Sequence, residues 1–353
     1  MDEIQYSVSE ICKIYQLDKK SRSTLHKART KGSIPTPIEG KRGSVKTYFW
    51  NKYDLPKIGA HYGFLKPADD FVCLTFHASK GGTLKTCLSY FVGRTLALNG
   101  IRVLMIGVDI QGSLTQVALN KLGAEDISEI GEIEQLPGIY EILQNKVKID
   151  KTIIQLDLPT LSLIPENPYL AEVEKMISAG RGSREETLKN KLIKPIRNSK
   201  KFDVVIIDTS PSFNKLTECS LVSATNGGLV SPIGCDVGSY FTADATVDGI
   251  ETFREEMLDA KVPIEWETTK IVPTLLASTK LSQQIHASYV HRYDNVTKNS
   301  IRRTVKGEQD LFSGVTPFES ASNPRLTEDY LGVITEIWTS CGGKVSLKGN
   351  ADE

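Results

Sequence analysis

The sequence has few cysteines, and none of them are spaced to hold a metal. The six cysteines of this 353-residue chain are scattered, and no two form a Cys-x-x-Cys pair. Zinc and iron–sulfur sites built on such pairs are therefore excluded, and a disulfide framework is not expected in a chain this long. Because several cysteines lie in apolar runs, we expect them to be small buried side chains.

Long apolar runs are also absent. No stretch approaches the roughly 18 apolar residues that a transmembrane helix needs. The beginning of the chain, MDEIQYSVSE, lacks the basic and apolar regions of a signal peptide. We therefore expect a cytoplasmic protein with no membrane partner.

The chain has no net charge, with 43 Lys and Arg against 43 Asp and Glu. Neutrality at first argues against a nucleic-acid-binding protein, but it hides an uneven distribution. Residues 1–67 carry 13 basic and 6 acidic side chains, and the remainder carries the matching acidic excess. This asymmetry suggests a basic nucleic-acid-binding arm on an acidic body. At about 150 residues per domain, the length predicts two or three structural units.

Residues 1–67 are predicted to form a small helical unit. Ser7 or Ser9 can cap a helix over Val8–Tyr15, and a second helix is expected over Ser21–Lys31. A basic turn then leads into a strand-like run, Val45–Trp50. This order is typical of a winged helix-turn-helix, whose second helix enters the major groove of DNA. The expected DNA contacts are Arg22, Lys27, Arg29, Lys41 and Arg42. A basic dimerisation arm is the alternative.

From about Phe71, short apolar runs alternate with longer helical stretches. The runs are Phe71–Phe76, Val103–Val108, Val204–Ile207, Gly228–Ser231 and Lys270–Val272. Buried runs that alternate with helices predict parallel strands joined by crossover helices. We therefore expect an α/β fold with a doubly wound, mostly parallel sheet over residues 68–341, followed by a polar tail at 342–353.

A candidate phosphate loop, HASKGGTLKT, spans residues 77–86 and leads into a helix predicted over Cys87–Leu98. Gly81 and Gly82 allow backbone N–H groups to converge on an anion, and the helix N-terminus favours the same charge. Lys85 would neutralise phosphates, and the Thr86 hydroxyl would bind Mg²⁺. The alternative is a glycine-rich turn that binds nothing, but two nearby lysines would then repel each other without a shared anion.

Two aspartates follow predicted strands. Asp109 ends the Val103–Val108 run, and Asp208 ends the Val204–Ile207 run in a Walker B arrangement, in which the carboxylate orients Mg²⁺ through its water shell. Each aspartate alone could simply cap a helix. The carboxyl ends of strands bind ligands in open α/β sheets, so three motifs in this order predict one site.

These residues resemble the ParA/MinD family of P-loop ATPases. Lys80-Gly81-Gly82-x-x-Lys85-Thr86 is similar to its deviant Walker A box, which usually has glycine at the position of Leu84. Asp109-Ile110-Gln111-Gly112 is similar to the family's Asp-Pro-Gln-Gly, and the family often has another aspartate where this chain has Gly107. Val272-Pro273-Thr274 resembles the stretch that borders the adenine base, and Leu163–Asn167 resembles a segment of the dimer face.

The resemblance implies ATP/ADP and Mg²⁺ as ligands and an ATP-sandwich homodimer. Lys80 would reach the phosphates of the partner, Lys85 would act on the phosphates in its own chain, and Asp109 would position the attacking water. The implied magnesium residues are Thr86, Asp109 and Asp208. The implied nucleotide-binding residues are Lys80, Gly81, Gly82, Thr83, Leu84, Lys85, Thr86, Cys87 and Pro273.

Residues 280–306 contain a cluster of basic side chains with only Asp294 as an acid. Its members are Lys280, Arg292, Lys298, Arg302, Arg303 and Lys306. In the family this region holds DNA nonspecifically through phosphates, a strongly salt-dependent mode of binding. A solvated helix face is the ordinary alternative.

Together these features predict an Mg²⁺-dependent ATPase that partitions plasmid DNA on the nucleoid and is stimulated by a ParB-type adaptor. The N-terminal unit would additionally bind an operator as an autorepressor. Two alternatives stay open: a ParA-like ATPase that positions another cargo, and a DNA-binding repressor that binds nucleotide without turnover. A MinD-like membrane role is disfavoured, because residues 342–353 are polar and Leu326–Trp338 is better explained as core packing.

Overall fold

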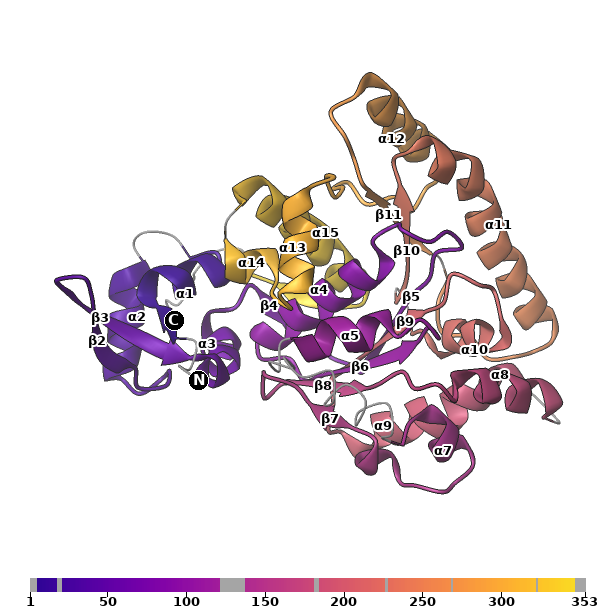
Figure 1. Ribbon diagram of the computed structural model, residues 1–353, viewed down its shortest axis with the longest axis horizontal. Helices are drawn as coiled ribbons and strands as arrows, with labels where there is room; N and C mark the ends of the chain where they lie inside the picture. The colour runs from indigo at the N-terminus through magenta and orange to yellow at the C-terminus, as the bar shows by residue number, and fades with distance from the viewer. Residues whose placement is uncertain are drawn as a thin grey trace.

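The structure, a computed structural model, describes residues 5–17, 21–120, 137–180, 184–225, 228–267, 269–321 and 323–346. Its centre is a seven-stranded sheet in the order β11-β10-β5-β9-β6-β8-β7, flanked by helices (Figure 1). Neighbouring strands are parallel except β7, which runs antiparallel to β8. The predicted doubly wound, mostly parallel α/β fold is confirmed.

The strands are β5 (Val72–Phe76), β6 (Val103–Val108), β7 (Ile154–Gln155), β8 (Leu161–Ile164), β9 (Val204–Thr209), β10 (Leu229–Gly234) and β11 (Lys270–Thr274). The last three extend two or three residues beyond the predicted runs, because polar and proline residues at their ends still pair in the ladder. The short strands β7, at the edge of the sheet, and β8, next to it, were not predicted.

The helices that follow the phosphate loop fall into two groups by their place in the chain. Those between the strands are α4 (Lys85–Leu98), α5 (Ser113–Asn120), α7 (Ile139–Leu143), α8 (Leu170–Ala179), α9 (Lys194–Ser199), α10 (Lys215–Ser223) and α11 (Val237–Asp259). Those after the last strand of the sheet are α12 (Lys280–Arg292), α13 (Val305–Phe312), α14 (Pro317–Ser320) and α15 (Pro324–Ser340). Within the described ranges, no helix is both long enough and apolar enough to cross a membrane.

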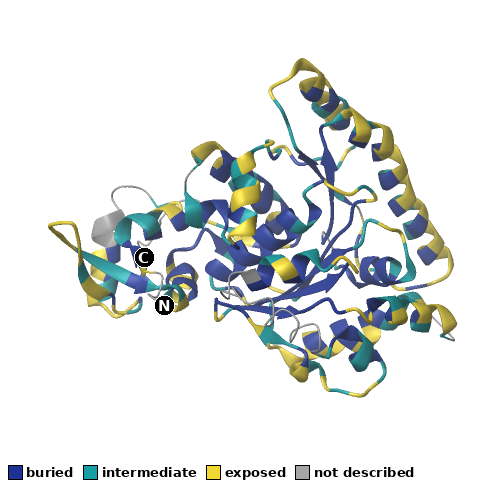
Figure 2. Cartoon of the chain, in the orientation of Figure 1, coloured by how far each residue is buried: buried dark blue, intermediate teal, exposed yellow. Residues whose placement is uncertain are grey.

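The central strands are buried on both faces, which explains their continuous apolar runs (Figure 2). Successive residues of β9 alternate between two cores: Val204 and Ile206 join one, and Val205 and Ile207 join the other. As expected, the cysteines are mostly buried; the buried ones are Cys73, Cys87, Cys219, Cys235 and Cys341.

The N-terminal unit combines a helix pair with a small sheet. It consists of β1 (Gln5–Ser7), α1 (Val8–Ile14), α2 (Ser21–Thr30), β2 (Ile38–Arg42) and β3 (Val45–Asn51). The strands pair antiparallel in the order β1-β3-β2, so a hairpin follows the two helices. Ser7 and Glu10 form a capping box at the start of α1, where Ser7 was predicted as one of two caps.

The predicted boundary at residue 67 does not separate two independent cores. Helix α3 (Leu55–Tyr62) packs on α4 so closely that a side chain at Gly59 would collide with the carbonyl of Leu98. The Tyr15 hydroxyl donates hydrogen bonds to the carbonyls of Leu55 and Leu98, at 2.5 and 3.2 Å. One continuous apolar cluster therefore joins the N-terminal unit to the body.

The prediction of a polar tail from residue 342 is wrong at its start. Strand β12 (Lys344–Val345) pairs antiparallel with β4 (Leu65–Lys66), and the Ser346 amide donates to the Phe64 carbonyl at 2.8 Å. Backbone hydrogen bonds order this segment although its side chains are largely polar. Residues 347–353 lie outside the described part of the chain.

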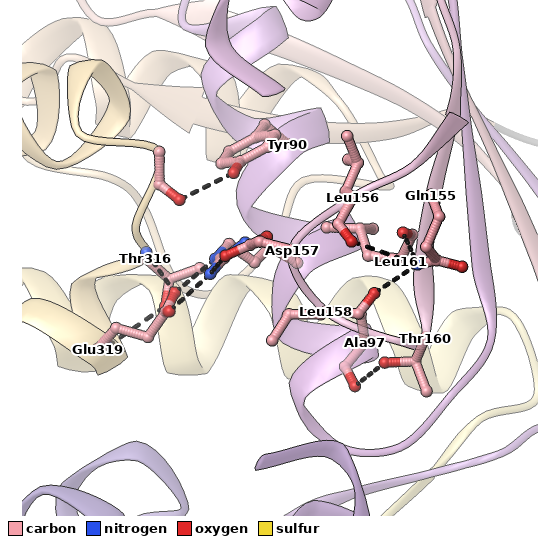
Figure 3. A network of polar contacts seen from close by, with 12 residues as sticks. Tyr90, Ala97, Gln155, Leu156, Asp157, Leu158, Thr160, Leu161, Thr316 and Glu319 are labelled. Carbon is pink, nitrogen blue, oxygen red and sulfur yellow. Dashed lines mark hydrogen bonds and ion pairs between the residues drawn. The ribbon is translucent and has the colours of Figure 1, made fainter. Parts of the chain in front are cut away.

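A buried charge cluster ties α4 to two distant segments (Figure 3). The Arg94 guanidinium donates to both carboxylate oxygens of Asp157 at 2.7 and 2.9 Å, and to both oxygens of Glu319 at 2.7 and 2.9 Å. All three side chains are at most 1% exposed. The helix that follows the phosphate loop is therefore fixed to the chain before β8 and to α14.

Candidate functional site

The phosphate loop, residues 77–84, connects β5 to α4. Its backbone is left-handed at Gly82 and at Leu84, with φ angles of 73° and 65°. Leu84 immediately precedes α4, and its side chain packs partly against the core. A Cβ atom added at Gly81 or Gly82 would meet nothing within 4 Å, so the space in front of the loop is open. The turn therefore keeps a glycine-like conformation at Leu84, which for an L residue costs about 1 kcal/mol.

Helix α4 starts at Lys85, two residues before the predicted start, and directs three side chains at Asp208. Lys85 Nζ lies 3.0 Å from Asp208 Oδ1, Thr86 Oγ1 donates to Oδ2 at 2.7 Å, and Ser89 Oγ donates to Oδ1 at 3.2 Å. Asp208 is 0% exposed and Lys85 is 7% exposed. The contact forms because β5 and β9 are parallel neighbours whose ends lie at one edge of the sheet. The structure thus joins two motifs that lie 122 residues apart.

Asp109 lies at the end of β6, on the other side of β9 from the loop. Its Oδ1 accepts a hydrogen bond from the Gln111 amide at 3.1 Å, and its carbonyl accepts from the Gly112 amide at 2.9 Å. Gly112 has a φ of 67°, which the tight turn requires. The ends of β5, β9 and β6 therefore bring the phosphate loop, Asp208 and Asp109 to adjacent positions.

Lys80 contacts α11 of its own chain. Its Nζ lies 3.0 Å from Asp236 Oδ1 and 3.0 Å from Ser239 Oγ. Asp236 also caps α11 by accepting from the Ser239 amide. Burial raises the pKa of Asp236, but hydrogen bonds from Ser239 and Lys80 outweigh it and hold the pKa at about 2. Asp236 is therefore ionised, and it pairs with the lysine that the family resemblance assigns to the partner's nucleotide.

Pro273 lies within β11 and is buried. Its carbonyl accepts a hydrogen bond from the Ile301 amide at 2.9 Å. The next residue reaches the phosphate loop directly, because Thr274 Oγ1 donates to the Thr83 carbonyl at 2.9 Å. Strand β11 thus supports the loop from the side away from β9.

Several polar side chains at the carboxyl ends of these strands were not predicted from the sequence. Asp236 and Ser239 were detectable, since Asp-x-x-Ser after an apolar run is a typical helix start at the carboxyl end of a strand. No motif in the sequence marked His77 as a residue of the site. His77 is fully buried, its Nδ1 lies 3.0 Å from Thr209 Oγ1, and its ring packs edge-on against Phe213. Burial and the charge of Lys85 lower the pKa of His77 to about 4, so the imidazole is neutral.

The arrangement fits a nucleotide with Mg²⁺. Hydroxyl and carboxylate oxygens, here from Thr86 and Asp208, are the ligands that Mg²⁺ prefers in proteins. Lys85 supplies a buried positive charge beside them, and the open space over Gly81 and Gly82 leaves room for phosphate. The site can therefore neutralise the charge of a polyphosphate.

The predicted basic residues of the N-terminal unit lie mostly on its surface. Lys27, Lys41 and Arg42 are exposed. Arg29 is half-buried, with its guanidinium 4.0 Å from the centre of the Tyr48 ring. The side chain of Arg22 lies outside the part of the structure that is described.

The predicted basic cluster at residues 280–306 divides into two groups. Arg292, Arg302 and Lys306 form ion pairs with Asp244, Asp329 and Asp310, at 2.8, 2.9 and 2.8 Å. Lys280, Lys298 and Arg303 are exposed, and none of them forms an ion pair with another described residue. The net positive charge of this surface is therefore smaller than the sequence suggests.

Comparisons with known proteins agree with this geometry. The family described as AAA domain matches residues 72–262, just over half of the chain. A ParA family protein of Chlamydia muridarum is 26% identical over 276 residues, which cover 75% of this chain and 96% of that protein.

Two solved structures share the fold. A plasmid partition protein of Borrelia burgdorferi bound to AMPPNP aligns with a TM-score of 0.60 at 21% identity, covering 76% of this chain and 99% of the other. A cobyrinic acid a,c-diamide synthase of Mycobacterium smegmatis, with a bound ATP analogue and magnesium, aligns with a TM-score of 0.55 at 27% identity, covering 69% and 91%. The chain belongs to the AAA domain family, as a ParA-type ATPase of the ParA/MinD superfamily.

Proposed function

We propose that this protein is a DNA-partition ATPase that segregates a plasmid. Members of the family bind and hydrolyse ATP with Mg²⁺. The observation that carries the proposal is the contact of Lys85 and Thr86 with Asp208, beside Asp109 at the same sheet edge. Phosphoryl transfer requires positioning and charge neutralisation rather than a covalent group, and these residues supply both.

Each residue has a distinct role in this proposal. Thr86 and Asp208 would hold Mg²⁺, which when bound would neutralise charge on the terminal phosphates. Lys85 pairs with the same phosphates, and the amides at the start of α4 bind their oxygens. Asp109 orients the attacking water through its carboxylate. The neutral His77 and the Thr209 hydroxyl fix the base of the loop against β9.

The proposal includes an ATP-sandwich homodimer closed by Lys80. In the described chain Lys80 pairs with Asp236 at 3.0 Å, and both side chains are about one-third exposed. A pair this exposed is worth at most about 1 kcal/mol. Lys80 can therefore leave Asp236 and reach the phosphates bound by the partner.

DNA and a ParB-type adaptor are the proposed partners. The exposed side chains of Lys280, Lys298 and Arg303 are suited to nonspecific phosphate contacts, with Arg292, Arg302 and Lys306 beside them. The N-terminal unit would bind an operator through Lys27, Arg29, Lys41 and Arg42, with Arg22 on the same helix α2. Its helix pair and antiparallel hairpin support this assignment.

A plasmid-loss assay tests the proposal. The chain would be supplied together with its neighbouring genes and the adjoining DNA, on an otherwise unstable low-copy plasmid. We expect the loss rate per generation to fall at least tenfold, and Lys85→Ala to abolish the effect. Unchanged loss together with repression of the chain's own promoter would instead support a repressor without turnover. Unchanged loss with nucleoid-dependent movement of another cargo would support a positioning ATPase.

A further inference from the structure

Gly107 on β6 is a glycine because another side chain occupies the space beside it. A Cβ atom at position 107 would fall inside the carboxyl group of Glu166, far below van der Waals distance. Glu166 follows β8, the neighbour of β6, and is 5% exposed. Its carboxyl group therefore fills the position that a side chain on β6 would otherwise occupy.

This position lies beside Asp208. Gly107 is directly opposite Asp208 in the parallel pair of β6 and β9, and side chains opposite each other in such a pair project to the same face. Burial raises the pKa of Glu166 to about 7, and the charge of Asp208 contributes to this shift. Two carboxyl groups thus lie side by side in the interior, next to Thr86 and Lys85.

The two oxygens of Glu166 differ in their surroundings. Oε2 accepts hydrogen bonds from the amide and the hydroxyl of Thr115, and Thr115 Oγ1 accepts from the Glu166 amide at 2.9 Å. Thr115 lies in the first turn of α5, directly after the Asp109–Gly112 turn. Oε1 is buried and has no hydrogen-bond partner among the described residues. A buried carboxylate oxygen without a partner is costly unless a ligand satisfies it.

We propose that Glu166 is a positioning residue of the magnesium site. Through Oε1 it accepts a hydrogen bond from the water shell of the Mg²⁺ held by Thr86 and Asp208. Through Oε2 it fixes α5 and so the turn that carries Asp109. In this chain Glu166 supplies the carboxylate from the end of β8. The ParA/MinD family often has an aspartate at the position of Gly107 instead. The inference rests on the proposed function, because it requires a nucleotide with Mg²⁺ at this site.

The test measures the Mg²⁺ dependence of binding of a fluorescent ADP analogue to the full-length chain, without reference to turnover. Glu166→Gln keeps the shape, and with its amide oxygen facing Thr115 it places an NH2 donor where Oε1 would accept a hydrogen bond. We expect it to raise the Mg²⁺ concentration for half-maximal binding about tenfold, as is typical when an outer-shell partner is lost. The matched control is Glu172→Gln, which changes an exposed carboxylate on α8. It should leave the Mg²⁺ concentration for half-maximal binding unchanged.

Moving the carboxylate from position 166 to position 107 distinguishes a positioning role of Glu166 from a packing role. Gly107→Asp alone should lower the melting temperature, because the new side chain collides with Glu166. Combined with Glu166→Ala, it should restore the Mg²⁺ dependence to within about threefold of wild type. The proposal is overturned if Glu166→Gln binds with wild-type Mg²⁺ dependence, or if the folded double variant stays as impaired as Glu166→Ala. Wild-type chain that binds no nucleotide would overturn the proposed function as well.

Discussion

Lys80 and Asp236 form an ion pair of 3.0 Å within one chain, between the phosphate loop and the N-terminus of α11. In the proposed sandwich dimer, Lys80 instead contacts the nucleotide of the partner. The internal pair therefore competes with dimer formation, and Asp236 sets part of the free energy that closure must overcome.

Asp236→Asn tests this competition. The amide oxygen can still cap α11, while the charge that holds Lys80 is removed. Each pair is about one-third exposed and worth at most about 1 kcal/mol, and both protomers break theirs on closure, so we expect at most about a 30-fold decrease in the ATP-dependent dimer dissociation constant. Sedimentation in an Asp109→Ala background, in which we expect no turnover, measures the dissociation constant. The control is Asp244→Asn. Asp244 lies in α11, the helix that Asp236 caps, and its substitution removes an exposed ion-pair partner of Arg292. An unchanged or weaker dimer in Asp236→Asn would show that Lys80 is not restrained by this pair.

At position 84 we expect the usual order of stability of alanine and glycine variants to be reversed. At ordinary helical positions glycine is less stable than alanine by about 1 kcal/mol. Because Leu84 has a φ of 65°, Leu84→Gly should be more stable than Leu84→Ala by about 1 kcal/mol, although both lose the same packing. Urea unfolding of the two variants measures the difference. If the alanine variant is the more stable one, the left-handed turn is not present at this position.

Arg94 supplies the positive charge of a fully buried cluster. Arg94→Met leaves Asp157 and Glu319 buried without their cation, and we expect it to lower the free energy of unfolding by about 3–5 kcal/mol. The matched variant is Arg102→Met, which removes a surface pair with Asp203 and should cost less than about 1 kcal/mol. Denaturant unfolding compares them, and equal losses would contradict the buried network.

Because the pKa of His77 is lowered, we expect the protein to lose stability in acid. This pKa is about 4 in the folded chain, against an ordinary value of 6.5, because of burial and Lys85. Between these values the unfolded chain binds a proton that the folded chain does not. The contribution of His77 is therefore fully present above pH 6.5 and falls by about 3 kcal/mol as the pH falls to 4.

The measurement needs a Glu166→Gln background, because Glu166 titrates in the opposite direction. Its pKa is raised to about 7, so its contribution is present below pH 4.5 and is lost as the pH rises through 7. In this background, His77→Gln should reduce the loss of stability between pH 6.5 and 4, whereas the exposed His61→Gln should not. A profile that keeps its slope in His77→Gln would assign the acid lability to another group.

The sequence predicted the sheet and the nucleotide motifs because local patterns carry them. Continuous apolar runs marked the central strands, and Asp109 and Asp208 stood out as polar residues at strand ends. The contacts of Lys80 with Asp236 and of Thr115 with Glu166 were not predicted, since no sequence motif links these residues across 156 and 51 positions. Gly107 looked like a simple departure from the family pattern, and only the packed structure relates it to Glu166.

The basic surfaces were the least predictable part. From the sequence, Arg292 and Arg302 were expected to be free to contact DNA. In the structure they form ion pairs with Asp244 and Asp329, which lie 48 and 27 positions away. Strand β12 was missed because backbone pairing with β4, and not side-chain pattern, orders it.

The decisive measurement is phosphate release by the full-length chain with ATP and Mg²⁺. We expect turnover that DNA and the adaptor increase. Asp109→Ala should bind ATP like wild type and release no phosphate, and Lys85→Ala should fail at binding. Absence of phosphate release by wild type in the presence of both partners, or turnover by Asp109→Ala at the wild-type rate, would contradict this expectation.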